Sequence, residues 1–490
     1  MKTISFRKPV VLSVISALII LLQRFFRNDR RIMQAVYRGV VRPIHLALIS
    51  WTGKVRFSIA EIVILLTGIS VLIWFVSSII RLIKHHEKGK QCLKIVLTLI
   101  SIVLCIYAGF CVLWGVYYYS EDFSENTGIR SRDISVEELE TVTAYFAAKA
   151  NEYADLVKRD ENGLYTGDKA EIIEKSGTLY REAEEVYPSL RGLEAPVKPF
   201  FFSKLLSLTD FMGFFFPFTG EANVNMDFPP SLFASTAAHE TAHQRGVARE
   251  QEANFCAVLS SFMNGDPDYC YSSALLAYTY LGNALYDENP DALIQIRSTL
   301  DERIIKDFNA NREYWEKYET PVQNVSNAVY EEFLCSYDQD LGLKSYGACV
   351  DLLVSYYLED AENCLQGHAF PSDEVIRREL FDPVLAFYPA TAGSSLGCAR
   401  ALGAMLSFAE KYDVVELKEA YHQLSEEEKK LYAENIMSVS SMLDELKKDQ
   451  TMVIGLMEDA GVDERIIDLA TNLAVIESCA KQLELMCALT

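Results

Sequence analysis

The sequence predicts a predominantly α-helical protein with N-terminal transmembrane helices, a mostly helical central domain with minor β structure, and a C-terminal helical domain. The first 120 residues are apolar and basic, amphipathic helical periods recur through the remainder, and only one short segment has the turn chemistry of a strand. We expect a membrane region at residues 1–120, a central domain at 121–366 and a C-terminal domain at 367–490.

Two apolar runs are long enough to cross a bilayer as helices. The first, Ser58–Ile80, contains one charge, Glu61, and the second follows Lys94 and ends in three tyrosines typical of a membrane interface. A shorter run, Pro9–Leu22, resembles a signal peptide but lacks a small-residue cleavage site. We therefore expect two clear transmembrane helices and one short helix that is retained.

The charge distribution indicates a membrane protein with an acidic body. Residues 1–120 carry 16 Lys and Arg against three acidic residues, which leaves 30 basic and 65 acidic residues in the rest of the chain. An acidic body would repel phosphates, so the expected partner is the lipid bilayer and not a nucleic acid. The positive-inside rule favours a cytoplasmic position for both the 24–56 and the 81–94 loops. The basic N-terminus and the acidic exit after the last run favour three spans with the body outside.

The sequence after residue 120, called the body, predicts mostly helix. Two capping boxes, Ser135 to Glu138 and Ser425 to Glu428, each open a long amphipathic stretch. Residues 199–218 contain eight phenylalanines, which predicts a core wall, with the membrane interface as the alternative. Residues 219–230, TGEANVNMDFPP, form the plausible strand. A loop at 338–342 and a proline-rich linker after residue 367 complete the outline.

Residues 239–243, HETAH, contain the candidate metal-binding and catalytic residues. Residues four apart lie on one helix face about 6 Å apart along the axis, so His239 and His243 can direct their imidazoles at one tetrahedral ion. Zn²⁺ is the expected cofactor of such a pair. Glu240 would then act as general base toward a water activated by the ion.

A third ligand has to come from beyond the helix, because a straight helix carries later residues out of reach. Gly246 supplies the break, and Glu250 and Glu252 are the candidates. The metzincin pattern requires His or Asp where this chain has Arg249. The segment Glu250-Gln-Glu-Ala-Asn254 instead resembles the third-ligand signature of gluzincin-type peptidases. That resemblance implies Glu250 as ligand, supported by Asn254 one turn later, and it leaves Glu252 as the alternative.

The order of features resembles an uncharacterised family of bacterial membrane proteins with a domain of unknown function. The resemblance lies in amino-terminal spans followed by PFTGEANVN, HETAHQRGVAREQEANF and DQDLGLKSYG, over roughly residues 30–360. It implies a zincin-like protein in the bacterial cell membrane and brings no substrate.

The expected function is a membrane-anchored zinc metallopeptidase that acts on a peptide or protein substrate. TGEANVN is a candidate edge strand for pairing with an extended peptide, and Tyr346, His368 and Arg249 are candidate donors to an oxyanion. Two alternatives stay open: a zinc hydrolase of a lipid or cell-wall amide, and a catalytically silent membrane scaffold with a structural metal. The sequence leaves the oligomeric state undetermined.

Overall fold

The chain divides into two compact units, Met1–Leu358 and Glu359–Thr490. The computed structural model describes residues 4–84, 86–337, 346–366, 376–386, 394–412, 417, 421 and 424–489. The membrane region and the expected central domain belong to one unit, and the division falls at residue 358 instead of 366. The expected loop at 338–342 and most of the expected linker lie outside the described residues.

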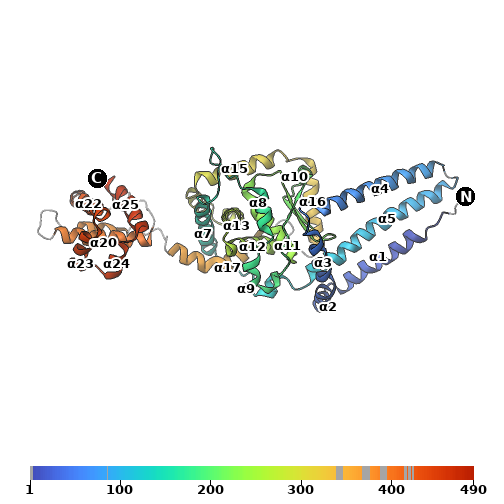
Figure 1. The fold of residues 1–490 in the computed structure, drawn as a ribbon, viewed down its shortest axis with the longest axis horizontal. Helices are drawn as coiled ribbons and strands as arrows, with labels where there is room; N and C mark the ends of the chain where they lie inside the picture. The colour runs from blue at the N-terminus through green and yellow to red at the C-terminus, as the bar shows by residue number, and fades with distance from the viewer. Residues whose placement is uncertain are drawn as a thin grey trace. The chain divides into compact units, whose positions relative to one another are not determined.

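Three apolar helices long enough to span a bilayer extend from one end of the first unit: α1 (Arg7–Phe26), α4 (Ile59–Lys84) and α5 (Lys88–Leu113). A 26-residue helix is about 39 Å long, and the hydrocarbon layer is about 30 Å thick. The start of α1 and the turn between α4 and α5 lie together, far from the body (Figure 1). The short run predicted at Pro9–Leu22 is part of the 20-residue helix α1. This helix also includes Arg7 and Lys8 at its start and Arg24 near its end.

The segment between the first two of these helices folds against the body. It contains α2 (Arg30–Val36), a π-helical turn (Tyr37–Val41) and α3 (Arg42–Thr52). Its arginines contact body residues: Arg30 pairs with Glu125, Arg38 Nη2 lies 2.9 Å from Glu121 Oε2, and Arg42 donates to the carbonyl of Arg245 at 3.3 Å. Arg30, Arg38 and Arg42, three of the eight Lys and Arg residues at 24–56, are thus engaged with protein groups.

The body is a helical layer on a small sheet. Its helices are α6 (Phe123–Thr127), α7 (Val136–Ala154), α8 (Lys169–Ser176), α9 (Arg181–Val186), α10 (Ser203–Leu208), α11 (Phe233–Arg245), α12 (Glu250–Asn264), α13 (Pro267–Glu288), α14 (Pro290–Ser298), α15 (Glu302–Glu316), α16 (Pro321–Ser336) and α17 (Tyr346–Gln366). The strands are β1 (Lys198–Phe200), β2 (Gly213–Phe216) and β3 (Glu221–Asn225), in the order β1-β3-β2, with β1 parallel and β2 antiparallel to β3. The prediction of a mostly helical protein with minor β structure is confirmed.

The strand expected in TGEANVN is present as β3, but it is not an edge strand. It lies between β1 and β2, and all five of its residues are buried. Its polar side chains hold the start of α4: the Glu221 carboxylate accepts from the backbone N–H groups of Ile59 and Ala60, and Ser58 Oγ donates to Asn223 Oδ1 at 2.6 Å. The prediction that this segment pairs with a substrate is therefore wrong, because its neighbours and α4 already occupy it.

The phenylalanine-rich segment 199–218 divides between two environments. Phe200 is buried, and the run Gly213–Phe216 forms β2, yet Phe201 is 84% exposed and Leu205 is 58% exposed. The prediction of a single core wall is therefore wrong for the start of α10, because Phe201, Phe202 and Leu205 are exposed.

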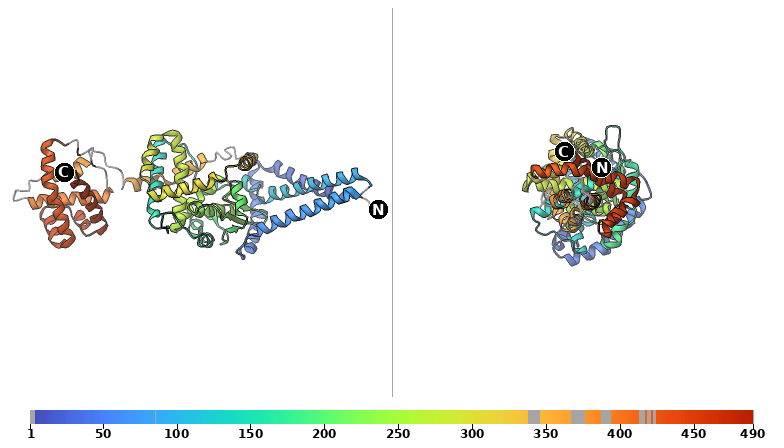
Figure 2. Two further views of the ribbon diagram at one scale, coloured as in Figure 1. Left: turned by 90° about the horizontal axis from the view of Figure 1, so that it is seen from above. Right: turned by 90° about the vertical axis from the view of Figure 1, so that its left-hand side faces the viewer.

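The second unit is helical and has its own core. Its described helices are α19 (Asp382–Leu385), α20 (Ser394–Lys411), α22 (Glu426–Lys448), α23 (Gln450–Asp459), α24 (Glu464–Leu469) and α25 (Leu473–Cys487), seen from two further directions in Figure 2. Tyr432, Phe381 and Leu402 are among the fully buried side chains of that core. Both predicted capping boxes are confirmed, at the starts of α7 and α22.

Candidate metal centre

The HETAH segment lies on α11, which is enclosed on nearly every side. Leu232, Thr236, His239 and His243, the expected stripe, all line one pocket. The small residues Ala237, Ala238 and Ala242 are fully buried, which lets α11 pack closely against its neighbours. The arrangement directs both imidazoles into the pocket.

Gly246 ends α11 in the way the sequence predicts. Its φ of +103° is left-handed, and its N–H and that of Val247 bond to carbonyls of the last helical turn. A Cβ at this position would meet Tyr117 Cε1 at 3.0 Å. The chain reverses here, and α12 begins four residues later at Glu250.

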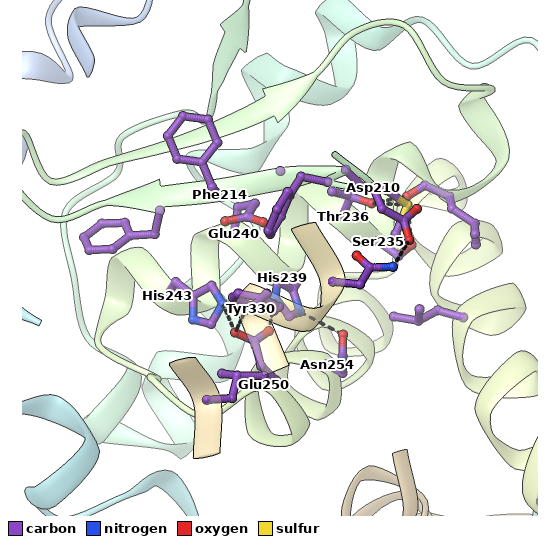
Figure 3. Close-up of a pocket in the computed structure, with 18 of the residues that line it drawn as sticks. Asp210, Phe214, Ser235, Thr236, His239, Glu240, His243, Glu250, Asn254 and Tyr330 are labelled. Carbon is purple, nitrogen blue, oxygen red and sulfur yellow. Dashed lines mark hydrogen bonds and ion pairs between the residues drawn. The ribbon is translucent and has the colours of Figure 1, made fainter. Parts of the chain in front are cut away.

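The reversal brings a carboxylate to the two histidines. His239 Nε2 lies 3.2 Å from Glu250 Oε2, and His243 Nε2 lies 3.6 Å from Glu250 Oε1. One potential ligand atom from each of the three residues lies within 4.8 Å of the others. Figure 3 shows the three side chains pointing toward one another.

Hydrogen bonds orient both imidazole rings. His243 Nδ1 lies 2.7 Å from the carbonyl oxygen of Val247, which can only accept, so Nδ1 carries the proton. His239 Nδ1 lies 2.8 Å from Asn254 Oδ1 and donates in the same way. In the neutral form of each ring, Nε2 is then left with a lone pair directed toward the Glu250 carboxylate. Lone pairs and a carboxylate facing one another require a cation or protons between them, and fixed Nδ1–H tautomers are typical of metal-bound histidines.

Asn254 therefore orients His239. The resemblance to gluzincin-type peptidases instead implies that Asn254 supports Glu250. The Glu250 carboxylate instead accepts a hydrogen bond at 2.8 Å from the hydroxyl of Tyr330, on α16. No local sequence signal marks this tyrosine, because it follows Glu250 by 80 residues and is one of 26 in the chain.

Glu252 points away from the histidines. Its carboxylate accepts from the backbone N–H groups of Phe123 at 3.2 Å and Ser124 at 3.0 Å, at the start of α6. A carboxylate at a helix N-terminus satisfies otherwise unpaired N–H groups. Of the two candidates, only Glu250 lies beside the histidines.

The three groups perturb one another electrostatically. Burial by itself would lower the pKa of His243, but the Glu250 carboxylate raises it to about 9. Burial acts to raise the pKa of Glu250, and the two histidines nevertheless hold it well below its usual range. The carboxylate is thus ionised, as a metal ligand has to be.

Glu240 is a buried carboxylate beside this cluster. Its Oε2 has no hydrogen-bond partner within the described part of the chain, and burial raises its pKa to about 7. Gly213 makes room for it, since a Cβ there would lie 2.7 Å from both Cγ and Oε1 of Glu240. A residue with any side chain at 213 would displace the carboxylate.

The pocket around these residues has a volume of about 600 Å³. Its wall includes Gly213, Phe214 and Phe215 of β2. This strand lies at one edge of the sheet, and none of the described strands pairs with its outer side. Phe110 and Trp114 come from the end of α5, so a membrane helix contributes to the same pocket.

Arg249 is the one candidate oxyanion donor whose side chain the structure describes, and it does not line this pocket. It forms an ion pair with Asp122 at 2.9 Å. His368 and the side chain of Tyr346 lie outside the described residues. Tyr118, which the sequence did not single out, does line the pocket, and its hydroxyl accepts a hydrogen bond from Trp114 Nε1 at 3.2 Å. Its own proton can therefore be donated toward a ligand.

A family profile described as "Protein of unknown function (DUF3810)" matches residues 35–354. The chain belongs to this family. The match runs from α2 to α17, includes the whole candidate metal centre, and leaves out the whole second unit. No curated protein and no solved structure matched the chain.

Proposed function

We propose that this protein is a membrane-anchored zinc-dependent metallopeptidase of the zincin type. His239, His243 and Glu250 would hold the ion, and Glu240 would be the general base. The observation that carries the proposal is Glu240: a buried carboxylate with one oxygen unpaired in the described structure, next to three convergent ligands and inside a pocket. An unpaired buried carboxylate is costly, so such a group favours a catalytic role.

The donor set fits zinc. Two imidazole nitrogens and one carboxylate oxygen are the ligands of many catalytic zinc sites, which keep a fourth position open. When bound there, zinc would lower the pKa of a water molecule and polarise a carbonyl group.

Each remaining step of peptide hydrolysis can be assigned to residues of this chain. Glu240 takes a proton from the attacking water, the water oxygen bonds to the carbonyl carbon, and the C–N bond breaks as Glu240 returns the proton to the amine. The Tyr118 hydroxyl, which lines the pocket, would donate a hydrogen bond to the oxygen that becomes negative. The outer edge of β2 supports backbone pairing with an extended peptide.

The alternatives differ in what they require of these groups. A silent scaffold with a structural metal would have no use for Glu240. A hydrolase of lipid or cell-wall amides would need Glu240 but no edge strand beside the metal. The peptidase uses both features, which is why it is preferred.

The charge distribution supports a location in the bacterial cell membrane with the body outside the cytoplasm. The distal end of the three membrane helices carries exposed basic residues, including Lys84, Lys88 and Lys90. At the body end, Arg30, Arg38 and Arg42 contact protein groups, as described above. The positive-inside rule then favours a cytoplasmic distal end. A phosphatase fused after residue 490 should be active in the periplasm, and activity only of a cytoplasmic reporter would contradict this orientation.

The direct test compares the full-length protein with Glu240→Gln in detergent. Zinc content is measured by elemental mass spectrometry, and hydrolysis is measured on casein. Equal zinc with lost cleavage is expected. Equal cleavage by the variant would refute the role of Glu240, and a zinc-free parent protein would refute the site.

A further inference from the structure

An exposed apolar surface lies on one side of the candidate metal centre. We call it the interfacial belt, and it consists of Phe201, Phe202 and Leu205 at α10 and of Val322, Val325 and Val329 on α16. Phe201 is 84% exposed and Val325 is 65% exposed. The three valines recur at a spacing of three and four residues, which places them on one face of α16. An exposed apolar surface of this kind marks an interaction site.

The belt lies at the level where the membrane helices begin. The Glu61 carboxylate, in the first turn of α4, accepts from the backbone N–H of Phe201 at 3.1 Å and of Phe202 at 2.9 Å. Ile62, the next residue of α4, already exposes its side chain. On α16, the Phe333 ring packs on Phe110 of α5 at a centroid distance of 5.5 Å. Both belt helices are therefore fixed to membrane helices at their body ends (Figure 1).

The end of α3 and the loop between α3 and α4 add a second sign of the interface. Trp51 and Phe57 are exposed, and so are Lys54 and Arg56 between them. Exposed aromatic and basic residues together are typical of the headgroup region of a bilayer. Lys198, three residues before Phe201, donates to the carbonyl of Val55 in this loop, so the loop lies near the α10 end of the belt.

The belt helices also form the rim of the pocket. The face of α16 opposite the valines carries Asn327 and Tyr330, which line the pocket. Ser326 Oγ donates to the carbonyl of Thr209 at 3.0 Å, and Asn327 Nδ2 donates to Asp210 Oδ2 at 3.0 Å. These bonds join α16 to the segment after α10, so the same two elements face the bilayer on one side and the metal centre on the other.

We propose that the interfacial belt is immersed in the headgroup region of the bilayer and that the substrate is a polypeptide segment flanking a transmembrane helix. This inference rests on the proposed peptidase function. A segment held at the membrane surface reaches the outer edge of β2 at a high effective concentration, whereas a soluble peptide does not. The apolar wall of the pocket, with Phe211, Phe214 and Phe215, suits residues next to a membrane anchor.

The first experiment tests the belt without using activity. Benzoylphenylalanine is incorporated at position 201 or 325 of the full-length protein in phospholipid nanodiscs and is irradiated. Position 156 is the matched control, because Leu156 is 60% exposed and comes two residues after the end of α7. Figure 1 shows α7 on the side of the body away from α4 and α5. Lipid adducts are expected at 201 and 325 and not at 156. Equal adduct formation at all three positions, or none at 201 and 325, would overturn the placement of the belt.

The second experiment tests the substrate class in liposomes containing the full-length protein. An unstructured casein segment is supplied either free or fused to a single transmembrane helix. Cleavage of the fused segment should be faster by about tenfold or more, as expected for a gain in effective concentration. Phe201→Asp with Val325→Asp should lower that ratio, and Leu156→Asp should not.

The two possible failures are distinguishable. Equal rates on the free and fused segments would overturn the substrate class and leave the peptidase function intact. Cleavage of neither segment would overturn the peptidase function together with the substrate class, and crosslinking would still decide the placement of the belt.

Discussion

The contact between Gly213 and Glu240 allows the position of the general base to be tested by adding one methyl group. In Gly213→Ala the new Cβ would lie 2.7 Å from Glu240 Cγ and 2.8 Å from the Asn223 carbonyl oxygen. Ordinary contacts between such atoms lie at about 3.5–4.0 Å, so a shift of about 1 Å is required. The Asn223 carbonyl belongs to β3 and cannot move freely, which leaves Glu240 as the group that is displaced.

Two consequences of this displacement are measurable. Overpacking of this kind costs about 1–3 kcal/mol of stability, and a misplacement of about 1 Å in a catalytic group costs about 100-fold in rate. Zinc content should be unchanged, because the three atoms nearest to the new methyl group belong to Glu240 and Asn223 and not to a ligand residue. Thermal unfolding, elemental analysis and casein cleavage measure the three quantities.

Gly455→Ala is the matched control, since no atom lies within 4 Å of a Cβ at that helical position. It should retain full stability and activity. If Gly213→Ala unfolded at the parental temperature and cleaved casein at the parental rate, the proposed seat of Glu240 against β2 would be refuted.

Three further predictions follow from the surroundings of the site. Tyr330→Phe removes the hydrogen bond to Glu250 and should weaken zinc affinity about 10- to 100-fold in a competition titration with a chelator; unchanged affinity would exclude a supporting role. Glu250→Gln should lose zinc. Glu252→Gln should keep zinc and lose about 1–3 kcal/mol of stability, because Glu252 only caps α6. The reverse pattern of zinc loss would identify Glu252 as the ligand. Burial lowers the pKa of His45 to about 4 from its ordinary 6.5, so the stability that neutral His45 contributes is fully present above pH 6.5 and is lost as the pH falls toward 4. The loss should approach about 3 kcal/mol, and an identical pH dependence in His45→Gln would contradict it.

The sequence predicts those features that depend on neighbouring residues. The ends of the apolar runs, the capping boxes at Ser135 and Ser425, and the left-handed stop at Gly246 are each encoded within a few positions. The placement of Glu250 beside the histidines also follows from a short turn. All of these are local consequences of helix geometry.

The remainder depends on contacts between distant segments. Tyr118 and Tyr330 reach the pocket from α5's exit and from α16, and no spacing rule distinguishes them from 24 other tyrosines. The strand β2 lies in an apolar run whose interruptions suggest neither a span nor a strand. The sequence predicts β3 as an edge strand open to a substrate, because the true partner of its polar residues, the start of α4, is more than 160 residues away. Tertiary pairing, and not local propensity, decided these elements.

The central claim is that His239, His243 and Glu250 form a zinc site, and X-ray absorption at the zinc edge of the purified full-length protein tests it most directly. The account predicts about one zinc per chain with only nitrogen and oxygen neighbours at about 2.0–2.1 Å, including two imidazoles. His239→Ala should abolish the signal. Absence of zinc, or sulfur neighbours at about 2.3 Å from any of the 11 cysteines, would contradict it.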